Sequence, residues 1–464
     1  MEAGHFLGID IGTTSSKVVV VNAETREEVA EASVPHNAEL NDLPAHHHEQ
    51  SPELLIGSVY ELLRKIQHEH DGVLESVKAI GISGQMHGCL LWDAAGWTSN
   101  LITWMDGRGS KEFLTSMPST NRSNLLHSGY GSVSLVWLQR NGLLPTDRAI
   151  FSGTIMDYLV CQMSGLKRAK TTHMLADSWG YFDHKRLAWD TVLTETIGEE
   201  ILPEIVEAGS WAGSLKETLF GLAQGTPILA ALGDFQTHFF AAEKTQAAIL
   251  NMGTSAQFSF EMPDGFQPPQ ILDNPPRPVQ FFPYLGKKYV CVAASLNGGN
   301  TLAAFLQAFK AWVSQLMPSV EVPEDDALWE RMEALLKEWE DEETPASPYP
   351  TTVPTLFGER HNPDATASVS GLSEPNIAHL PGLLGSLVMG LVGNLFSMIT
   401  PELLKKSEVK EIVLTGLATK PWFAPAVRRH LRHQSASFSV SSAAKRLDSA
   451  YGAALIAGKY LDRY

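Results

Sequence analysis

The sequence has few cysteines and a shortage of positive charge. Its three cysteines, Cys89, Cys161 and Cys291, lie far apart and form no Cys-x-x-Cys pair. Neither a disulfide framework nor a cysteine zinc site is therefore expected, and a reducing, cytoplasmic compartment fits. Lysine and arginine total 35 against 52 acidic residues, a net charge of −17. This balance argues against a nucleic-acid or anionic-membrane binder, so any anionic ligand must be held by local groups.

Long apolar runs are also scarce. The first apolar stretch contains Asp10, so it does not resemble a signal peptide. The segment Pro381–Ile399 is apolar enough to raise the question of a membrane span, but it contains four glycines and an asparagine. We therefore predict a buried, closely packed helix there and no membrane partner.

What is present indicates an α/β protein of two or three domains, because the chain has 464 residues, of which 44% are apolar and 19% charged. The pattern predicts a hairpin over Phe6–Asn22 and a further strand near Glu28–Val34. A helix is expected to begin at Ser51-Pro52, and a strand is expected over Val77–Ile82.

The same design returns in the second half of the chain. A strand, a Gly-Thr-Ser turn and another strand occupy residues 247–260, and Gly253 follows Gly12 by 241 positions. This repeat suggests two related halves, with domains over residues 1–240 and 241–464. A strand over Thr226–Leu232 and the start of a helix at Asp234 precede the boundary. An acidic helix with an apolar stripe is expected within Glu321–Glu343.

The first glycine and threonine turn could cradle phosphate groups. Successive backbone N–H groups and hydroxyls at Gly12, Thr13 and Thr14 can face phosphate oxygens, while Lys17 adds positive charge and Asp10 can hold Mg²⁺. An ordinary hairpin with a glycine turn is the alternative. The second turn favours phosphate binding, because two such loops could grip different phosphates of one nucleotide.

Asp234 is the candidate general base, because a carboxylate directly after an apolar strand can take a proton from a sugar hydroxyl that attacks phosphorus. The alternative is that Asp234 merely caps a helix. Walker-type, Rossmann and serine-hydrolase motifs are absent from the sequence. The run from His46 to Glu49 is more typical of a solvated loop than of a metal site.

Three segments together resemble the FGGY family of carbohydrate kinases, and their order and spacing match as well. They are Phe6–Lys17, Leu232–Gln236 and Leu250–Ser255. The resemblance covers residues 6 to 460. It implies a two-domain, duplicated actin- and hexokinase-like (ribonuclease H-like) ATPase fold, with Mg²⁺, ATP and a sugar bound in the cleft between the domains.

The resemblance also implies residue roles. Asp10 would hold Mg²⁺, and Asp234 would be the base. The residues that would contact the nucleotide are Gly12, Thr13, Thr14, Lys17, Gly253, Thr254, Ser255, Gly298, Gly299, Asn300 and Gly416. Those that would contact the sugar are Gln85, Met86, His87, Trp104, Asp106, Asp234 and Gln236. A lone histidine such as His87 is otherwise more often a packed or solvated side chain.

Within the family, segments such as Ser83–Gly88 and Phe357–Asp364 are most similar to members that phosphorylate sedoheptulose. The implied reaction is phosphorylation of the terminal primary hydroxyl of a ketose, here sedoheptulose, by a monomer or homodimer. A xylulokinase or another family kinase is the alternative. From other classes, a non-catalytic sugar- or nucleotide-binding regulator would agree with Leu417 and Trp422, which depart from the family's adenosine segment. A structural ATPase of the actin or chaperone type is disfavoured by Asp234.

Overall fold

The computed structural model describes residues 4–118, 126–269, 278–341, 349–399, 401–433, 438–443 and 447–464. Its first large sheet has the strand order β13-β14-β5-β1-β2-β3, with β15 beside β5. The strands are β1 (His5–Ile11), β2 (Ser15–Asn22), β3 (Glu28–Pro35), β5 (Val77–Gly84), β13 (Trp211–Ser214), β14 (Pro227–Leu229) and β15 (Leu232–Gly233). The hairpin of β1 and β2 and the following strand β3 were all predicted from the sequence and are confirmed.

The second large sheet has the order β18-β19-β17-β16-β22-β23. Its strands are β16 (Ala247–Met252), β17 (Ala256–Glu261), β18 (Val279–Pro283), β19 (Tyr289–Ser295), β22 (Glu411–Gly416) and β23 (Ser439–Ser442). In both sheets an antiparallel hairpin is extended by a third antiparallel strand on one side, and by parallel strands on the other. The matching plan confirms the repeat that the two glycine turns suggest, whereas the boundary after residue 240 stays a prediction.

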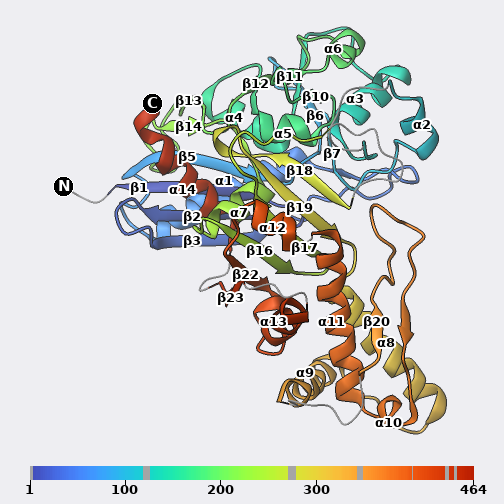
Figure 1. The fold of residues 1–464 in the computed structure, drawn as a ribbon. Coiled ribbons are helices and arrows are strands. Elements are labelled where there is room, and N and C mark those ends of the chain that lie inside the picture. Colours follow the sequence, from blue (N-terminus) through green and yellow to red (C-terminus); the bar gives the residue numbers. More distant parts are fainter. Residues whose placement is uncertain are drawn as a thin grey trace.

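Helices pack around these sheets (Figure 1). They are α1 (Pro52–Glu69), α2 (Lys111–Ser116), α3 (Gly131–Arg140), α4 (Ile155–Ser164), α5 (His173–Ser178), α6 (Thr191–Ile197), α7 (Asp234–Ala241), α8 (Gly299–Leu316), α9 (Asp325–Asp341), α10 (Glu374–Ile377), α11 (Leu380–Met398), α12 (Pro401–Lys406), α13 (Phe423–His433) and α14 (Ser449–Tyr460). In Figure 1, α9 and α10 lie away from both sheets. Helix α1 begins as predicted, because the Ser51 side chain accepts a hydrogen bond from the Leu54 backbone N–H. The acidic helix is α9, and the last two residues of the acidic segment lie outside the described residues.

Short strands complete the fold around the large sheets. They are β4 (Glu49–Gln50), β6 (Leu90–Asp93), β7 (Leu101–Ile102), β8 (Ile150–Gly153), β9 (Lys170–Thr172), β10 (Phe182–Asp183), β11 (Ala188–Trp189), β12 (Glu204–Val206), β20 (Thr351–Val353) and β21 (Ser368–Ser370). Among them, β20 and β21 pair with each other and carry the long loop 354–367 between them.

Helix α11 corresponds to the apolar segment of the sequence. It is the one helix among the described residues whose length and composition would allow a membrane crossing. Its side chains pack into the core of the second sheet, where Val388, Val392 and Leu395 are fully buried beside strand residues such as Phe258. The predicted closely packed, buried helix is therefore confirmed.

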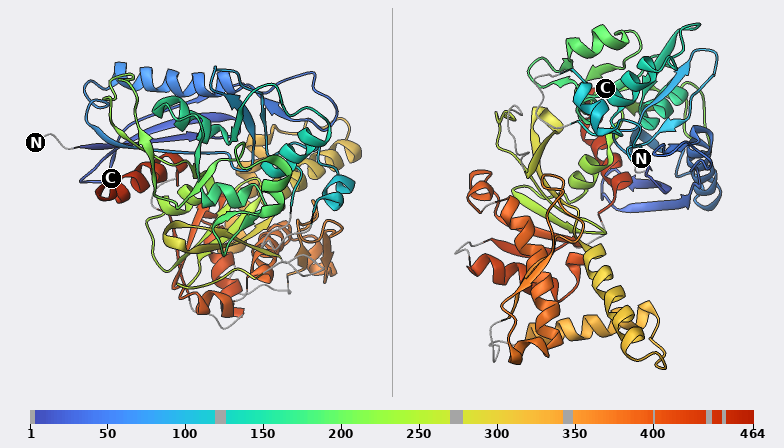
Figure 2. Two further views of the ribbon diagram at one scale, coloured as in Figure 1. Left: turned by 90° about the horizontal axis from the view of Figure 1, so that it is seen from above. Right: turned by 90° about the vertical axis from the view of Figure 1, so that its right-hand side faces the viewer.

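The last helix, α14, returns to the first sheet, although it follows β23 of the second sheet. A Cβ atom on Gly8 of β1 would lie 1.8 Å from the carbonyl oxygen of Ala450, and one on Gly81 of β5 would lie 2.2 Å from that of Ala453. Glycine at these two positions thus lets the helix backbone touch the sheet. In both views of Figure 2 the red C-terminal helix lies against the blue part of the chain.

The sequence predicted one strand over Thr226–Leu232, and the structure divides it into β14 and β15. Between them, the backbone N–H of Ala230 donates to the carbonyl of Ser210, and the carbonyl of Ala231 accepts from the Thr172 hydroxyl at 2.7 Å. Ser210 precedes β13 and Thr172 ends β9, so Ala230 and Ala231 are bonded to neighbours other than β5.

Candidate active site

Two carboxylates lie at the ends of neighbouring strands of the first sheet. Asp10 lies near the end of β1, opposite Ser83 of β5, and its Oδ1 accepts a hydrogen bond from the Ser83 hydroxyl at 2.8 Å. Burial raises the pKa of Asp10 to about 6, and the negative charge of Asp448 raises it further, while the Ser83 hydrogen bond and Lys17 oppose the shift. Asp10 is therefore poised to gain stability from a cation.

Asp234 is the first residue of α7, directly after β15. Burial, followed by the negative charge of Asp10, raises the pKa of Asp234 to about 7, and a hydrogen bond from the Phe235 backbone N–H at 2.7 Å partly offsets this. The helix cap is Gly233, so the carboxyl of Asp234 does not cap α7. A carboxyl with a near-neutral pKa is suited to proton transfer.

The first predicted phosphate loop is held by polar side chains from outside it. The Gln50 side-chain amide donates to the Thr13 carbonyl at 2.8 Å, and that of Gln85 donates to the Gly12 carbonyl at 3.3 Å and to Gln50 Oε1 at 2.8 Å. The Trp104 indole N–H reaches the Thr13 hydroxyl at 3.1 Å. Carbonyls of the loop are thus turned toward the protein and satisfied there. Gln85 and Trp104 therefore support this loop. Their predicted contacts with a sugar stay predictions.

Lys17 lies on β2, paired with Asp10. Its ammonium group makes ion pairs with Glu31 and Asp448, both at 2.8 Å. Contact between Lys17 and a phosphate stays a prediction, and such a phosphate would have to compete with these two carboxylates. Asp448 itself caps α14 through a hydrogen bond from the Tyr451 backbone N–H at 2.9 Å.

The second predicted phosphate loop packs against the start of α8. The backbone N–H of Gly299 donates to the Gly253 carbonyl at 2.8 Å, and that of Asn300 donates to the Thr254 carbonyl at 3.0 Å. A Cβ atom on Gly298 would lie 2.6 Å from the carbonyl carbon of Ser255, so the contact requires glycine. Six predicted nucleotide residues are therefore brought together here.

Gly416 ends β22 beside this second loop. It has a φ of +63°, and a Cβ atom there would lie 2.4 Å from the Met252 carbonyl oxygen. Gly416 thus lies against Met252, the residue before the second loop, and its contact with a nucleotide stays a prediction. The convergence of the two loops on one triphosphate stays a prediction.

The predicted sugar residues after β5 are ordered by their neighbours. His87 has a φ of +75°, and its Nδ1 lies 2.7 Å from the Ser178 carbonyl, so Nδ1 carries the proton and Nε2 is left as an acceptor. Burial lowers the pKa of His87 to about 4 and keeps the ring neutral. Met86 lies against Gly233, whose Cβ would approach the Met86 sulfur to 2.7 Å. This contact places Met86 and His87 next to the segment that carries Asp234.

Gln236 is fully buried on α7 and donates to the Pro283 carbonyl at 3.4 Å. Its Oε1 has no hydrogen-bond partner among the described residues, and the same holds for Oε1 of Gln85. A buried acceptor without a partner costs free energy of about 1–3 kcal/mol. Sugar contact by Gln236 and Gln85 stays a prediction, since neither oxygen is exposed to solvent.

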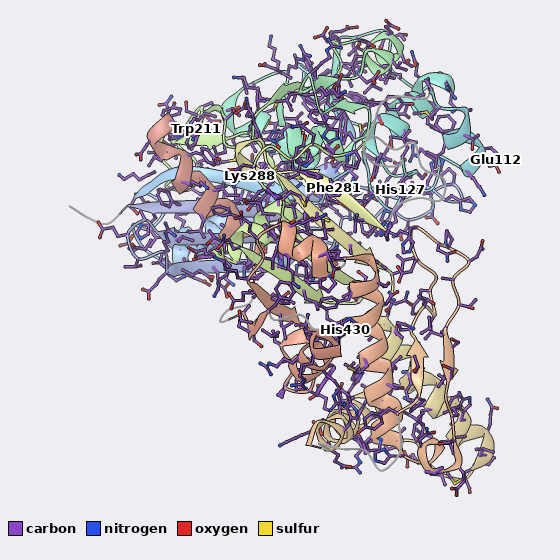
Figure 3. The ribbon with its side chains drawn as sticks, in the orientation of Figure 1. Glu112, His127, Trp211, Phe281, Lys288 and His430 are labelled. Carbon is purple, nitrogen blue, oxygen red and sulfur yellow. The ribbon has the colours of Figure 1, made fainter. Side chains whose placement is uncertain are left out.

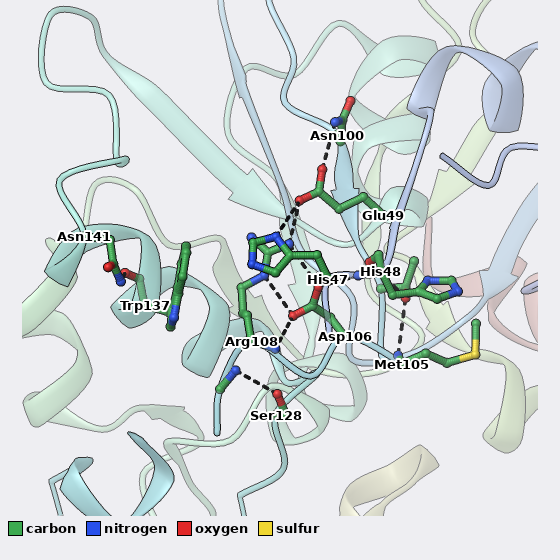
Figure 4. A network of polar contacts seen from close by, with 12 residues as sticks. His47, His48, Glu49, Asn100, Met105, Asp106, Arg108, Ser128, Trp137 and Asn141 are labelled. Carbon is green, nitrogen blue, oxygen red and sulfur yellow. Dashed lines mark hydrogen bonds and ion pairs between the residues drawn. The ribbon is translucent and has the colours of Figure 1, made fainter. Parts of the chain in front are cut away.

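Asp106 lies in a buried network shown in Figure 4. Both of its carboxylate oxygens accept from the Arg108 guanidinium, at 2.8 and 2.9 Å, and one also accepts from the His48 backbone N–H at 2.7 Å. Arg108 also reaches Glu49 at 2.5 Å. Sugar contact by Asp106 stays a prediction, since the carboxylate already has these partners.

Sequence reasoning missed several groups that shape the site. Ser83 could have been found, because it ends a strand and carries a hydroxyl. The Asp448-Ser449 pair before a small-residue helix was a signal for a helix cap. The pairing of Arg108 with Asp106, two residues apart, was also visible. No local signal marked Gln50, which reaches the first loop from another strand.

The model for the N-terminal domain of the FGGY family of carbohydrate kinases matches residues 5–241. A mouse (Mus musculus) protein named sedoheptulokinase is 34% identical over 477 residues, covering 97% of this chain and 96% of that protein. A human (Homo sapiens) protein of the same name is 34% identical over 447 residues and covers 89% of each.

Solved structures share the fold. Xylulose kinase from Rhodospirillum rubrum superposes with a TM-score of 0.80 at 19% identity, covering 98% of this chain and 89% of the other. A Plasmodium falciparum glycerol kinase with ADP gives a TM-score of 0.77 at 18% identity, covering 100% and 90%. These likenesses confirm the two-domain fold predicted from the sequence.

Proposed function

Because this chain belongs to the FGGY family of carbohydrate kinases, we propose that it transfers the γ-phosphoryl group of ATP to the terminal primary hydroxyl of sedoheptulose, giving sedoheptulose 7-phosphate. The pair formed by Asp10 and Asp234 carries the chemical part of this proposal. The choice of sugar is supported by the two proteins named sedoheptulokinase, which match nearly the whole chain.

In the proposed reaction Asp234 accepts the proton of the attacking hydroxyl. Its pKa of about 7 means that the carboxyl is substantially ionised at neutral pH and can still hold a proton as the hydroxyl is lost. Backbone N–H groups of the two glycine loops would orient the phosphates. Because phosphoryl transfer has a loose transition state, this positioning and charge stabilisation would supply much of the acceleration.

Asp10 fits the proposed role of Mg²⁺ ligand. Mg²⁺ keeps several waters and is held by one or two carboxylates plus substrate phosphates. Among the described residues no group of three or more His, Cys, Asp or Glu side chains could form a metal cage. Asp10 offers a carboxylate whose raised pKa shows that its charge is poorly compensated. When bound, Mg²⁺ would neutralise phosphate charge during transfer.

The test is ADP release by the purified chain with ATP, Mg²⁺ and a panel of sedoheptulose, xylulose, ribulose, fructose and glycerol. We expect the highest kcat/KM with sedoheptulose. Absence of sugar-stimulated turnover would overturn the kinase proposal. A preference for xylulose would change only the substrate, in line with the Escherichia coli xylulose kinase that is 26% identical over 408 residues.

Location and assembly are also proposals. A cytoplasmic location is supported by three cysteines that are all buried and free. A monomer or homodimer stays the prediction for the oligomeric state.

A further inference from the structure

A cluster of aromatic rings lies beyond Met86 and His87. The His87 ring is stacked on that of Tyr130, with centroids 4.7 Å apart and planes within 1° of parallel. His127 meets Tyr130 edge-on at 5.3 Å. The cluster joins the segment after β5 to the segment that leads into α3. It is therefore a firm wall whose polar atoms have fixed directions.

The polar atoms of this wall have unused hydrogen-bonding capacity. His87 uses only Nδ1 among its ring atoms. Within the described ranges of the chain, no hydrogen bond is recorded for the ring nitrogens of His127 or for the Tyr130 hydroxyl. Burial lowers the pKa of both histidines, so each presents a neutral ring with an acceptor. Partly buried polar atoms without protein partners are what a ligand-binding surface requires.

The part of the chain after the second hairpin brings a positive charge, that of Arg360, near the wall. Arg360 lies on the loop 354–367, which rises from β20 and β21 toward the first sheet in Figure 1, and whose tip lies below His127 in Figure 3. The positive charge of Arg360 acts on His87, His127 and Tyr130. Arg360 is exposed and makes no recorded ion pair or side-chain hydrogen bond within the described residues.

The loop that carries Arg360 is anchored at the neighbouring residue. The buried carboxylate of Glu359 accepts from the Ser295 hydroxyl at 2.5 Å, from the Asn297 amide at 3.0 Å and from the Asn394 amide at 2.7 Å. Glu359 and Asn362 also exchange two backbone hydrogen bonds of 3.0 Å. The guanidinium is therefore presented from a fixed turn, which limits the entropy lost when it binds a ligand.

We propose that Arg360, His127 and the stacked His87–Tyr130 pair form the end of the sugar site remote from Asp234, where they recognise the far oxygens of a long ketose. This inference rests on the proposed function. Met86 contacts Gly233 beside Asp234, and His87 follows Met86 in the sequence, so the wall begins next to the segment that carries the proposed base. A seven-carbon sugar has more oxygens to offer such a wall than a five-carbon sugar.

The chemistry of the wall favours a neutral polyol. The guanidinium only donates hydrogen bonds, the two neutral histidines offer acceptors, and a sugar hydroxyl can do both. The charge of Asp177 also acts on His87, opposing that of Arg360. A substrate that carried a phosphate group at this end would be repelled by that negative charge. Arg360 is thus assigned as a specificity-determining residue supplied by the part of the chain after the second hairpin.

The test compares Arg360→Met with Arg331→Met, a control on α9. The Arg331 side chain is exposed and, among the described residues, makes a single ion pair, of 3.7 Å, with Glu338. For Arg360→Met we expect the KM for sedoheptulose to rise about ten-fold. The KM for xylulose should rise less, and the KM for ATP and the kcat should stay the same. Arg331→Met should match the unmodified chain throughout. His127→Asn provides a second variant. It should also lower the ratio of kcat/KM for sedoheptulose to kcat/KM for xylulose.

An unchanged sedoheptulose-to-xylulose ratio of kcat/KM in both variants would overturn the inference and leave the kinase proposal standing. Equal losses with both sugars would also overturn it, because they would indicate a general role rather than recognition of length. If the unmodified chain shows no sugar-stimulated turnover, the proposed function fails first, and the inference falls with it. Calorimetric titration of sedoheptulose without ATP separates lost sugar binding from lost catalysis.

Discussion

The two hairpin loops share a frame and differ in charge. A shift of 241 positions places Asp10 on Asn251, and in each case a neighbouring parallel strand supplies a hydroxyl donor, Ser83 at 2.8 Å and Thr415 at 2.9 Å. Asn251 Oδ1 accepts its hydrogen bond as a neutral amide, whereas burial raises the pKa of Asp10 despite the hydrogen bond from Ser83. The repeat therefore preserved the scaffold, while only the first loop kept an ionisable group.

The same shift places Lys17 on Phe258, which is fully buried in the second core. The first loop thus has a carboxylate, Asp10, and an ammonium group, Lys17, on adjacent strands. The second loop has neither group at the corresponding positions. We infer that both loops can position phosphates through backbone groups, and that metal binding and proton transfer are confined to the first sheet. The following predictions test this division of roles.

The largest effect is expected for Asp234→Asn. Removal of the proposed base should lower kcat by roughly 10²–10⁴-fold, because the amide cannot take the hydroxyl proton. Sugar and nucleotide binding, measured by calorimetry, should persist. Retention of full turnover would remove Asp234 from the mechanism, and a chain with no turnover to lose would favour the alternative of a non-catalytic regulator.

Asp10→Asn converts the first loop to the chemistry of the second. We expect a loss of roughly 10²-fold in kcat/KM and a higher Mg²⁺ requirement, because a carboxylate ligand is replaced by a neutral amide. A double variant that combines Asp10→Asn with Asn251→Asp moves the carboxylate from the first loop to the second. We expect its kcat/KM to stay as low as that of Asp10→Asn alone. Steady-state rates over a Mg²⁺ titration measure both. Restoration by the double variant would show that the two loops are interchangeable.

Gly81→Ala tests a contact found only at the first sheet. The new methyl group would lie 2.2 Å from the Ala453 carbonyl, so α14 or β5 must move, and we expect a loss of about 3 kcal/mol in the free energy of unfolding. The control is Gly57→Ala on the exposed face of α1, where nothing lies within 4 Å. It should gain about 0.5–1 kcal/mol. Urea unfolding measures both, and equal stabilities would contradict the tight contact.

The smallest effect concerns pH. The folded-state pKa of Asp234 is about 7, above the unfolded value near 3.8, so the folded chain binds more protons between these values. The stability contributed by the protonated group is present at low pH and lost as pH rises through about 7. Because the side chain is partly exposed, we expect a contribution of about 1–2 kcal/mol. Asp234→Asn should flatten the dependence of ligand-free stability between pH 5 and 8, and an unchanged slope would contradict the shift.

Much of the fold could be predicted from local patterns. The hairpins around Gly12 and Gly253, the cap at Ser51 and the apolar periodicity of α11 each depend on residues close in sequence. The division of the strand over Thr226–Leu232 could not be predicted, because its backbone partners, Ser210 and Thr172, are supplied by other elements.

The candidate site shows the same limit. Gly298, Gly299 and Asn300 were expected beside the second loop and are found there. The pairing of Lys17 with Asp448 joins residues more than 400 positions apart and has no local signature. The proximity of Arg360 to His87 could likewise not be predicted, because the two residues are far apart in the sequence.

The order of residues by itself determined the duplicated strands, their glycine loops and the acids that follow them, because turns and strand periodicity arise from short-range backbone sterics. Only the tertiary structure decided that α14 would return to the first sheet and that Asp10 would raise the pKa of Asp234. It also decided which partners Lys17 and Asp106 would have. Charge interactions and burial depend on distances in space, and these are set when remote segments pack.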